Sequence, residues 1–560
     1  MTLLFLLGLA LRVIGNGWGL VSTAALADAG CPMPDIQERP GTVGSYVYDE
    51  EAFGTFLPCV SLSAEKDEDH DLEGTPVRSN LHSYMVEKRK QMIGNPLSPL
   101  FYAWWTRLIG RFQGDSEKRL QECDGQISLF YNTGRYFTAL MSMAALVPFM
   151  LIMSHVVRKH DDKKLLSFGA AILFCFQPAI VVHSHWISYN PLMVLLQLMG
   201  FWLFIRLCQG LKSGPFTAAL KWSLLFGMVT GAGIAVKDTA ISLAVFAVAG
   251  LLLMAFQEYG FTGCCIKYWK SGYFRSSLLI VFFTYLAYVV LTNLFVETAV
   301  VPATMKGSSY NLFSALHLET VIHYFSKTLP AGLGWPVYAA GIFGLAVNIV
   351  GYRKLSIERK LLIIWAGTLI LGFTSTPLGR APQRSLMVYC LWIYFAVWFL
   401  EALLYRSRAY ALLLSGYLIL GCATACFLVD YFLVEDTRGY RTEASRYVLE
   451  HIPHGSTLVF NSRQKHSQID LGMFEDNMKQ DGARLYDYKY RYYWKDLEPE
   501  WKGYAVYFKD RKPGLQELAE FESIIKKEKG YVRYLRMGLG FHRFDQLIRV
   551  PSYSIYRIAD

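Results

Sequence analysis

The sequence predicts a polytopic α-helical membrane protein with a smaller α/β domain at its C-terminal end. Of the 560 residues, 53% are hydrophobic, 15% are aromatic and only 18% are charged, whereas soluble domains carry about 25% charged residues. Apolar segments recur along residues 1–435, and the basic residues between them gather at alternate ends. From about residue 436 the composition becomes polar. We therefore expect a transmembrane domain over residues 1–435 and an α/β domain over residues 436–560.

About eleven transmembrane helices are expected, because a helix needs about 20 apolar residues to cross the hydrocarbon core. The first apolar segment lacks a basic N-terminal region and is interrupted by Arg12, so we interpret it as a retained helix rather than a signal peptide. The first nine expected spans lie at about residues 2–21, 135–157, 165–182, 191–206, 222–236, 239–256, 276–295, 336–352 and 361–374. The tenth begins near residue 384, and the eleventh ends near residue 434.

The distribution of charge predicts how these helices are oriented. The loops after the even-numbered spans are rich in Lys and Arg, whereas the turns on the other face carry few basic residues. The positive-inside rule therefore places those loops and the N-terminus in the cytoplasm. The first large loop (about residues 28–131), the turn with Lys237, the turn with Arg380 and Arg384, and the C-terminal domain then face outward. We expect a bacterial plasma membrane with a periplasmic site; the alternative is an endoplasmic-reticulum membrane with a lumenal site.

The first large loop has its own recognisable segments. The stretch at residues 96–112 is apolar and aromatic with basic ends, which is typical of a helix that lies along the membrane interface. Cys31, Cys59 and Cys123 also fall in this loop. The sequence leaves open whether any of them form a disulfide, for example Cys31 with Cys59.

The polar C-terminal region mixes helical and extended patterns, which predicts a small α/β domain. Helices are expected at residues 442–451 and 515–529, and strands at residues 457–461, 484–493, 504–509 and 552–558.

Three adjacent carboxylates, Asp49, Glu50 and Glu51, follow the first span. Taken alone, an acidic cluster beside a membrane is more often a solvated loop than a site. Here four cations are expected on the same face, which favours a joint site: Lys237, Arg380, Arg384 and Arg135.

Each of these cations also has a structural explanation. Lys237 and Asp238 could form a self-neutralising pair at the membrane boundary. Arg380 and Arg384 could be interfacial anchors, and Arg135 could cap the second span. Ionisable residues at membrane depth are nevertheless expensive and seldom without a function, and the four together fit a site better than each does alone.

Several other functions are disfavoured. The formal net charge is +10, but the basic residues lie in short clusters between apolar segments, which topology explains better than nucleic-acid binding. The chain has neither a GxxxxGK[ST] phosphate loop nor a GxGxxG motif after a strand. His183 and His185 lie two residues apart beside Trp186, where polar turn residues are more common than a metal site.

A carboxylate and fixed cations suit the transfer of a sugar from a lipid phosphate. The carboxylate can accept the proton of an acceptor hydroxyl, and the cations can stabilise the charge on the departing phosphate. A donor with an isoprenoid tail stays in the bilayer, so such a site must lie at its surface. A single displacement would invert the anomeric carbon.

The order of several segments resembles the GT-C superfamily of polyprenyl-phosphate-sugar-dependent glycosyltransferases, especially protein O-mannosyltransferase-like and aminoarabinose-transferase-like members. The matching segments, in order along nearly the whole chain, are LALRVIGNGWGL, YDEEAF, NPLSPLFYAWW, the turn at residues 183–191, GAGIAVKDTAISLA, PQRSLMVYCLWIYF, EASRYVLEHIPHGSTLVF and VPSYSIYRI.

This resemblance implies roles for particular residues. Asp49 would be the catalytic carboxylate with Glu50 beside it. Lys237 and Arg384, with Arg380 and Arg135, would bind the donor phosphate. The acceptor or sugar pocket would contain Tyr48, His185 and Asn190.

The sequence also departs from the family pattern. Many relatives carry an Asp in the turn before the fourth span, where this chain has Asn190, which weakens the case for a metal ion that bridges two carboxylates. About thirty residues separate the WGL segment from the acidic residues, whereas many relatives have fewer, so the loop is expected to be reshaped, for example for a different acceptor.

We therefore expect an inverting glycosyltransferase, a hexosyl- or pentosyltransferase, that uses a polyprenyl-phosphate monosaccharide and no cofactor; a metal ion is not favoured. The acceptor could be a protein, a lipid or a glycan, and the sequence does not identify the sugar. The alternative is a transporter or flippase of lipid-linked sugars without transfer chemistry, which would favour internal symmetry or paired broken helices. Neither feature is clear in this sequence. A receptor or scaffold is a third option.

Overall fold

The structure is a computed structural model of the whole chain. It describes residues 2–14, 20–22, 42–45, 97–112, 123–157, 162–213, 216–295, 318–374, 385–437, 440–453, 455–460, 489–492, 503–508, 516–521, 530 and 553–558. The structural statements below concern these residues.

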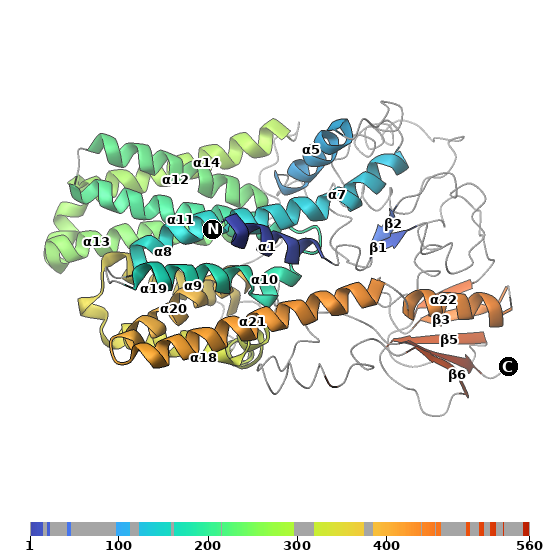
Figure 1. Cartoon of the computed structure of the whole chain (residues 1–560). Coiled ribbons are helices and arrows are strands. Elements are labelled where there is room, and N and C mark those ends of the chain that lie inside the picture. Colours follow the sequence, from blue (N-terminus) through green and yellow to red (C-terminus); the bar gives the residue numbers. More distant parts are fainter. Residues whose placement is uncertain are drawn as a thin grey trace.

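Long helices run side by side in one bundle (Figure 1). The helices before the C-terminal domain are α1 (Thr2–Val13), α5 (Leu97–Phe112), α7 (Cys123–Ala144), α8 (Leu146–Val156), α9 (Lys163–Cys175), α10 (Pro178–Val182), α11 (Tyr189–Ser213), α12 (Phe216–Val236), α13 (Ile241–Lys267), α14 (Gly272–Phe295), α16 (Leu318–His323), α17 (Leu329–Leu333), α18 (Trp335–Val350), α19 (Ile357–Thr374), α20 (Leu386–Leu404) and α21 (Arg408–Thr437).

Within the described residues, seven helical stretches are long and apolar enough to cross a membrane. They are Leu129–Val156, Tyr189–Lys212, Ala219–Val236, Ile241–Gly260, Gly272–Thr292, Leu386–Leu404 and Arg408–Leu433. The other four predicted spans coincide with α1, α9, α18 and α19, which are shorter or, in α19, carry three charged residues near the start. A polytopic helical membrane protein is therefore the observed fold class, and the number eleven stays a prediction.

The third predicted span is not one continuous helix. It divides into α9 and α10 at Gln177, whose backbone is extended, because Pro178 follows at the first position of α10. A residue before proline is disfavoured in the helical region, so the break is a local effect that the apolar pattern alone does not reveal.

Small residues allow several helices to approach each other closely. A Cβ atom on Gly227 of α12 would lie 2.6 Å from Cβ of Phe283, and one on Gly231 would lie 2.5 Å from the Thr284 carbonyl oxygen of α14. Gly344 of α18 similarly faces the Phe395 carbonyl of α20. Such packing supplies much of the attraction between helices in a bilayer, where lipid tails are as apolar as the side chains.

A buried ion pair joins four helices at the opposite end of the bundle from α10. Arg359 of α19 pairs with Glu401 of α20, and both side chains are 4% exposed. Arg359 also donates hydrogen bonds to the Val156 carbonyl at 2.7 Å and to Asn348 Oδ1 at 3.1 Å. The guanidinium is therefore fully engaged by α8, α18 and α20.

The C-terminal domain contains α22 (Tyr440–His451) and a five-stranded sheet in the order β4-β3-β5-β7-β6. Its strands are β3 (Thr457–Phe460), β4 (Lys489–Tyr492), β5 (Gly503–Phe508), β6 (Gln516–Phe521) and β7 (Tyr553–Ile558). Strand β3 is parallel to β4 and β5, whereas β7 is antiparallel to β5 and β6. This is the predicted mixture of helix and strand.

One predicted element of this domain was wrong. We expected a helix at residues 515–529, but residues 516–521 form β6. Gln, Glu, Leu and Ala favour helices in isolation, yet β6 pairs along its length with β7, and Leu518 and Phe521 pack on the domain core. Tertiary pairing outweighs local propensity at this edge of the sheet.

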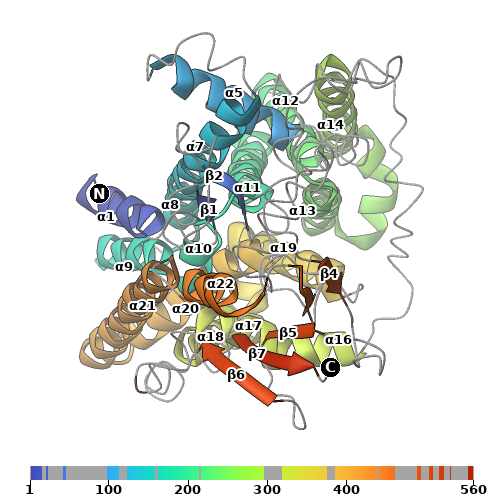
Figure 2. The same cartoon turned by 90° about the vertical axis from the view of Figure 1, so that its right-hand side faces the viewer.

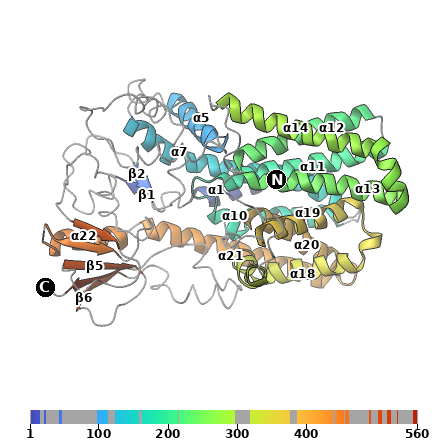
Figure 3. The same cartoon turned by 180° about the vertical axis from the view of Figure 1, so that it is seen from behind.

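Two short strands after α1 lie at the same end of the bundle as the C-terminal domain. The first of them overlaps the end of the first predicted span, because the described helix α1 ends at Val13 rather than near residue 21. Strands β1 (Leu20–Ser22) and β2 (Thr42–Ser45) form an antiparallel pair. Figures 1 and 3 place this pair and the C-terminal sheet at one end of the bundle, the pair beside α7 and the sheet beyond the end of α21. β2 also contacts α7. The charge pattern predicts this shared face, while its assignment to the outer side of the membrane stays a prediction.

Candidate functional site

Four of the predicted site residues belong to the described part of the chain: Arg135, His185, Asn190 and Lys237. The other five lie outside the described residues, so their roles stay predictions: Tyr48, Asp49, Glu50, Arg380 and Arg384. Cys31 and Cys59 also lie outside them, and of Cys123 only the backbone is described.

The turn between α10 and α11 is the polar part of the site. Ser188 precedes α11, and its Oγ accepts hydrogen bonds from the Asn190 backbone N–H at 3.1 Å and from Asn190 Nδ2 at 2.8 Å. Serine at this position commonly satisfies the free N–H groups at a helix start. Asn190 is 3% exposed, and within the described residues its Oδ1 has no hydrogen-bond partner.

Helix α5 fastens this turn to α7. Tyr102 Oη lies 2.5 Å from Thr138 Oγ1 of α7 and donates a hydrogen bond to the Ser188 carbonyl at 2.9 Å. Trp105 Nε1 donates to the Thr133 carbonyl at 2.9 Å. Figure 2 shows α5 lying across the ends of neighbouring helices, and it contacts α7, α12 and α14. The aromatic stretch predicted to lie along the membrane interface thus forms a helix that holds the turn in place.

Lys237 follows the last residue of α12 and reaches the first residue of α11. Its Nζ lies 4.4 Å from the centroid of the Tyr189 ring, and both side chains are half-buried. Among the side chains that the structure describes, no carboxylate pairs with Lys237. The Asp238 side chain lies outside that set, so the pairing of these two neighbours is not decided. The ammonium is thus held by a neutral ring next to a polar turn.

Arg135 lies inside the bundle. It is 1% exposed on α7, so this guanidinium is less accessible than Lys237. The positive charge of Arg135 also disfavours a proton on the His185 ring. Its predicted contact with a donor phosphate stays a prediction.

His185 connects three helices. The ring is fully buried; its Nδ1 lies 2.8 Å from the Val181 carbonyl of α10, and its Nε2 lies 2.6 Å from the carbonyl of Ile14, just after α1. Nε2 also lies 3.6 Å from the Asp430 carboxylate of α21. Burial lowers the pKa of His185 to about 4, and the two carbonyl contacts oppose this effect. In this geometry His185 is a link between helices, and its predicted place in a sugar pocket is not tested.

Two buried ionisable residues near His185, Arg12 and Asp430, belong to this region. Neither was predicted from the sequence as a site residue. Arg12 donates hydrogen bonds to Ser142 Oγ at 2.9 Å and to the carbonyls of Gly8 at 2.8 Å, Cys175 at 3.0 Å and Phe174 at 3.4 Å. Two of these carbonyls end α9, where the helix dipole favours a cation. A charged residue within an apolar segment was the available signal for both Arg12 and Asp430.

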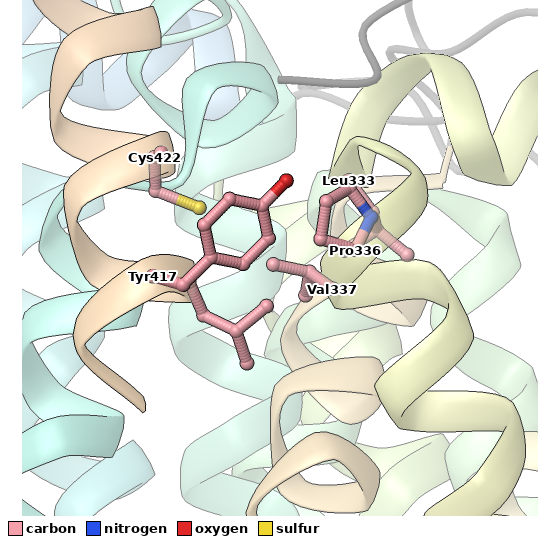
Figure 4. A pocket seen from close by; sticks show the side chains of 7 residues that line it. Leu333, Pro336, Val337, Tyr417 and Cys422 are labelled. Carbon is pink, nitrogen blue, oxygen red and sulfur yellow. The ribbon is translucent and has the colours of Figure 1, made fainter. Parts of the chain in front are cut away.

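A shallow apolar groove lies elsewhere in the bundle, between α17, α18 and α21 (Figure 4). Its lining contains no charged side chain and none of the predicted site residues: Leu333, Pro336, Val337, Tyr417, Leu418, Gly421 and Cys422. Its only side-chain polar groups are the Tyr417 hydroxyl and the Cys422 thiol.

Metal binding receives no support from the described part of the chain. There, no three His, Cys, Asp or Glu side chains gather around one point. Asp49 and Glu50, whose carboxylates could bind a metal ion, lie outside the described residues. Metal independence therefore stays a prediction.

The arrangement is that of a polytopic membrane protein whose polar turn, half-buried cation and additional α/β domain lie at one end of a helical bundle. No protein-family profile matches the sequence, and a search of curated proteins finds no relative. Solved structures of low sequence identity share part of the fold.

One of these structures is ArnT from Cupriavidus metallidurans bound to undecaprenyl phosphate, with 12% identity and a TM-score of 0.44 over 80% of this chain and 72% of that chain. Another is the archaeal oligosaccharyltransferase AglB from Archaeoglobus fulgidus, in complex with an inhibitory peptide and a dolichol-phosphate, with 11% identity and a TM-score of 0.40. The present chain spans 56% of the length of that protein, and the alignment covers 69% of this chain. At this identity and TM-score, no residue role, donor or acceptor is carried over.

Proposed function

We propose that this protein is an inverting glycosyltransferase that moves a monosaccharide from a polyprenyl-phosphate donor to an acceptor at the outer surface of a membrane. The observation that carries the proposal is Lys237. It is a half-buried cation at the polar end of a helical bundle, where the only described side chain that holds its ammonium is the uncharged Tyr189. A cation kept at membrane depth without a described counter-charge suits an anionic ligand.

The position of β2 supports a place for Asp49 near α7, the helix of Arg135. β2 contacts α7 and ends at Ser45, four residues before Asp49. Four residues of extended chain span at most about 14 Å. Asp49 therefore belongs within that distance of a strand that is packed on the helix of Arg135.

The proposed reaction is a single displacement. Asp49 accepts the proton of the acceptor group while the acceptor oxygen or nitrogen bonds to the anomeric carbon. The bond between that carbon and the phosphate oxygen breaks, and the lipid phosphate leaves with the electron pair. Lys237 and Arg384 stabilise its charge, with Arg380 and Arg135 as further cations. Attack from the face opposite the phosphate inverts the anomeric carbon.

The expected test uses purified protein and radiolabelled polyprenyl-phosphate monosaccharides, with release of the free lipid phosphate as the readout. Asp49→Asn should remove transfer while the protein remains folded. Glu51→Gln is the control for a general loss of acidic charge. Normal turnover by Asp49→Asn would contradict the assigned base, and movement of the donor across vesicles without release would favour a flippase.

Lys237→Ala and Arg384→Ala should weaken donor binding more than acceptor binding. The structure offers a control within α12, the helix that precedes Lys237, because Lys221 also lies over an aromatic ring, with Nζ 5.5 Å from the centroid of Trp222. Lys221→Ala removes an exposed cation near the other end of α12 and should leave donor binding unchanged. Unchanged donor titrations for both Lys237→Ala and Arg384→Ala would refute the proposed phosphate site.

The proposal specifies neither the acceptor nor the cell type. A protein, lipid or glycan acceptor is compatible with the residues named here. Mass spectrometry of lipid that copurifies with the protein would identify the length of the isoprenoid chain and its head group, and thereby distinguish a bacterial plasma membrane from an endoplasmic-reticulum membrane.

A further inference from the structure

The contact between Lys237 and Tyr189 has a property that a salt bridge lacks. The ring attracts the ammonium through its quadrupole, and such a contact is worth about 0.5–2 kcal/mol depending on burial. It leaves the positive charge unneutralised. A carboxylate at the same place would hold the ammonium more strongly but would compete with any incoming anion.

The Tyr189 ring is itself held by its surroundings. It stands at the first position of α11, where Ser188 caps the helix start and Tyr102 binds the Ser188 carbonyl. Its side chain packs against a small buried cluster from α5, α11 and α12 that includes Leu97, Met193 and Val236. The ring therefore provides a fixed surface for a flexible lysine.

The neighbouring polar group supports a ligand at this place. Asn190 Oδ1 is buried and has no hydrogen-bond partner within the described residues. An unsatisfied buried polar atom costs about 1–3 kcal/mol. Asn190 follows Tyr189 in the chain, so the first turn of α11 carries both a hydrogen-bond acceptor without a described partner and the ring that holds Lys237.

We propose that Tyr189 is a positioning residue whose aromatic ring holds the Lys237 ammonium in place for the phosphate of a lipid-linked sugar. This inference rests on the proposed function, in which Lys237 binds that phosphate. Tyr189 acts through Lys237, so its loss should weaken donor binding and raise the KM for the donor. Because Lys237 also stabilises the departing phosphate, kcat should fall as well, but turnover should persist since the proposed base is intact.

The experiment compares Tyr189→Phe with Tyr189→Leu in the full-length protein in detergent. The probe is undecaprenyl phosphate, titrated by isothermal calorimetry, and sodium phosphate is titrated in parallel. Tyr189→Phe keeps the ring and should bind within about twofold of the unmodified protein. Tyr189→Leu should weaken binding by about 3- to 30-fold, the factor that corresponds to the strength of a cation–π contact. Tighter binding of undecaprenyl phosphate than of sodium phosphate identifies a lipid phosphate as the ligand. Equal binding of both would overturn the assignment to a lipid.

A shape-conserving series guards against misfolding of Tyr189→Leu. Phenylalanines with increasing numbers of fluorine atoms, introduced at position 189, weaken the quadrupole of the ring while they keep its size. The dissociation constant should rise stepwise with fluorine number. A constant value across the series, or equal losses for Tyr189→Phe and Tyr189→Leu, would overturn the inference.

The Lys237→Ala variant separates this inference from the proposed function. If Lys237→Ala weakens binding of undecaprenyl phosphate but the ring variants do not, the role of Tyr189 is wrong and the phosphate site stands. If Lys237→Ala binds the lipid normally, the proposed phosphate site is wrong, and the inference falls with it.

Discussion

Replacing Arg359 by Met should strongly destabilise the transmembrane domain, because it leaves Glu401 buried without its cation. Both side chains are 4% exposed, so water cannot replace the lost partner. The Val156 carbonyl and Asn348 Oδ1 would also lose a donor. Removal of one partner of a buried ion pair costs about 3–5 kcal/mol, and we expect the free energy of unfolding to fall by that amount.

The measurement is unfolding in mixed micelles, titrated with a denaturing detergent and followed by tryptophan fluorescence. Trp398 is a local reporter, since Cζ of Arg359 lies 5.0 Å from its ring centroid. The double variant with Arg359→Met and Glu401→Leu removes both charges and should regain most of the lost stability, because apolar replacements of buried pairs are often neutral. Arg353→Met, an exposed control, should change little. The expected cost of a broken buried pair is well above about 1 kcal/mol. A free energy of unfolding for Arg359→Met within about 1 kcal/mol of the unmodified protein would therefore refute this reasoning. A double variant that is no more stable than Arg359→Met would refute it as well.

Two further perturbations test the packing of the bundle. The pKa of buried His185 is about 4, below about 6.5 for the unfolded chain. The unfolded state therefore binds a proton first, and the free energy of unfolding should fall by up to about 3 kcal/mol as the pH drops from about 6.5 to about 4; His185→Gln should flatten this pH profile of thermal unfolding. Gly344→Ala forces a methyl group onto the Phe395 carbonyl and should lower the melting temperature by several degrees, whereas Gly367→Ala, which meets open space, should not.

The transmembrane helices could be predicted because length and apolar composition decide them in a bilayer. Each predicted span has a helix at its place, and the turns at Lys237 and at His183 lie where polarity interrupts the pattern. The break before Pro178 was missed because an apolar pattern does not distinguish one helix from two in line. The strand β6 was missed because its partner β7 lies more than thirty residues away in sequence, beyond the reach of local propensity.

The candidate site could be predicted in part for similar reasons. A lysine in a turn between two apolar helices is conspicuous in the sequence, so Lys237 was found. Tyr189, which contacts Lys237, is 48 residues away in sequence. It could not be predicted, because the contact depends on how α11 and α12 pack. Sequence also gave no sign that His185 is enclosed, since a histidine in a polar turn has the same local pattern whether it faces solvent or α21.

The buried residues around α1 bear on the acidic residues of the first loop. Arg12 fixes the end of α1 to α7 and α9 through Ser142 and two terminal carbonyls of α9, and His185 contacts the Ile14 carbonyl where the loop begins. β2, which ends shortly before Asp49, contacts α7. The chain is thus attached to the bundle on both sides of residues 23–41. Both attachments involve α7 or the α10–α11 turn, and Tyr189, which holds Lys237, begins α11 directly after that turn. If the proposed function is right, Arg12→Met should therefore lower the release of lipid phosphate in the transfer assay.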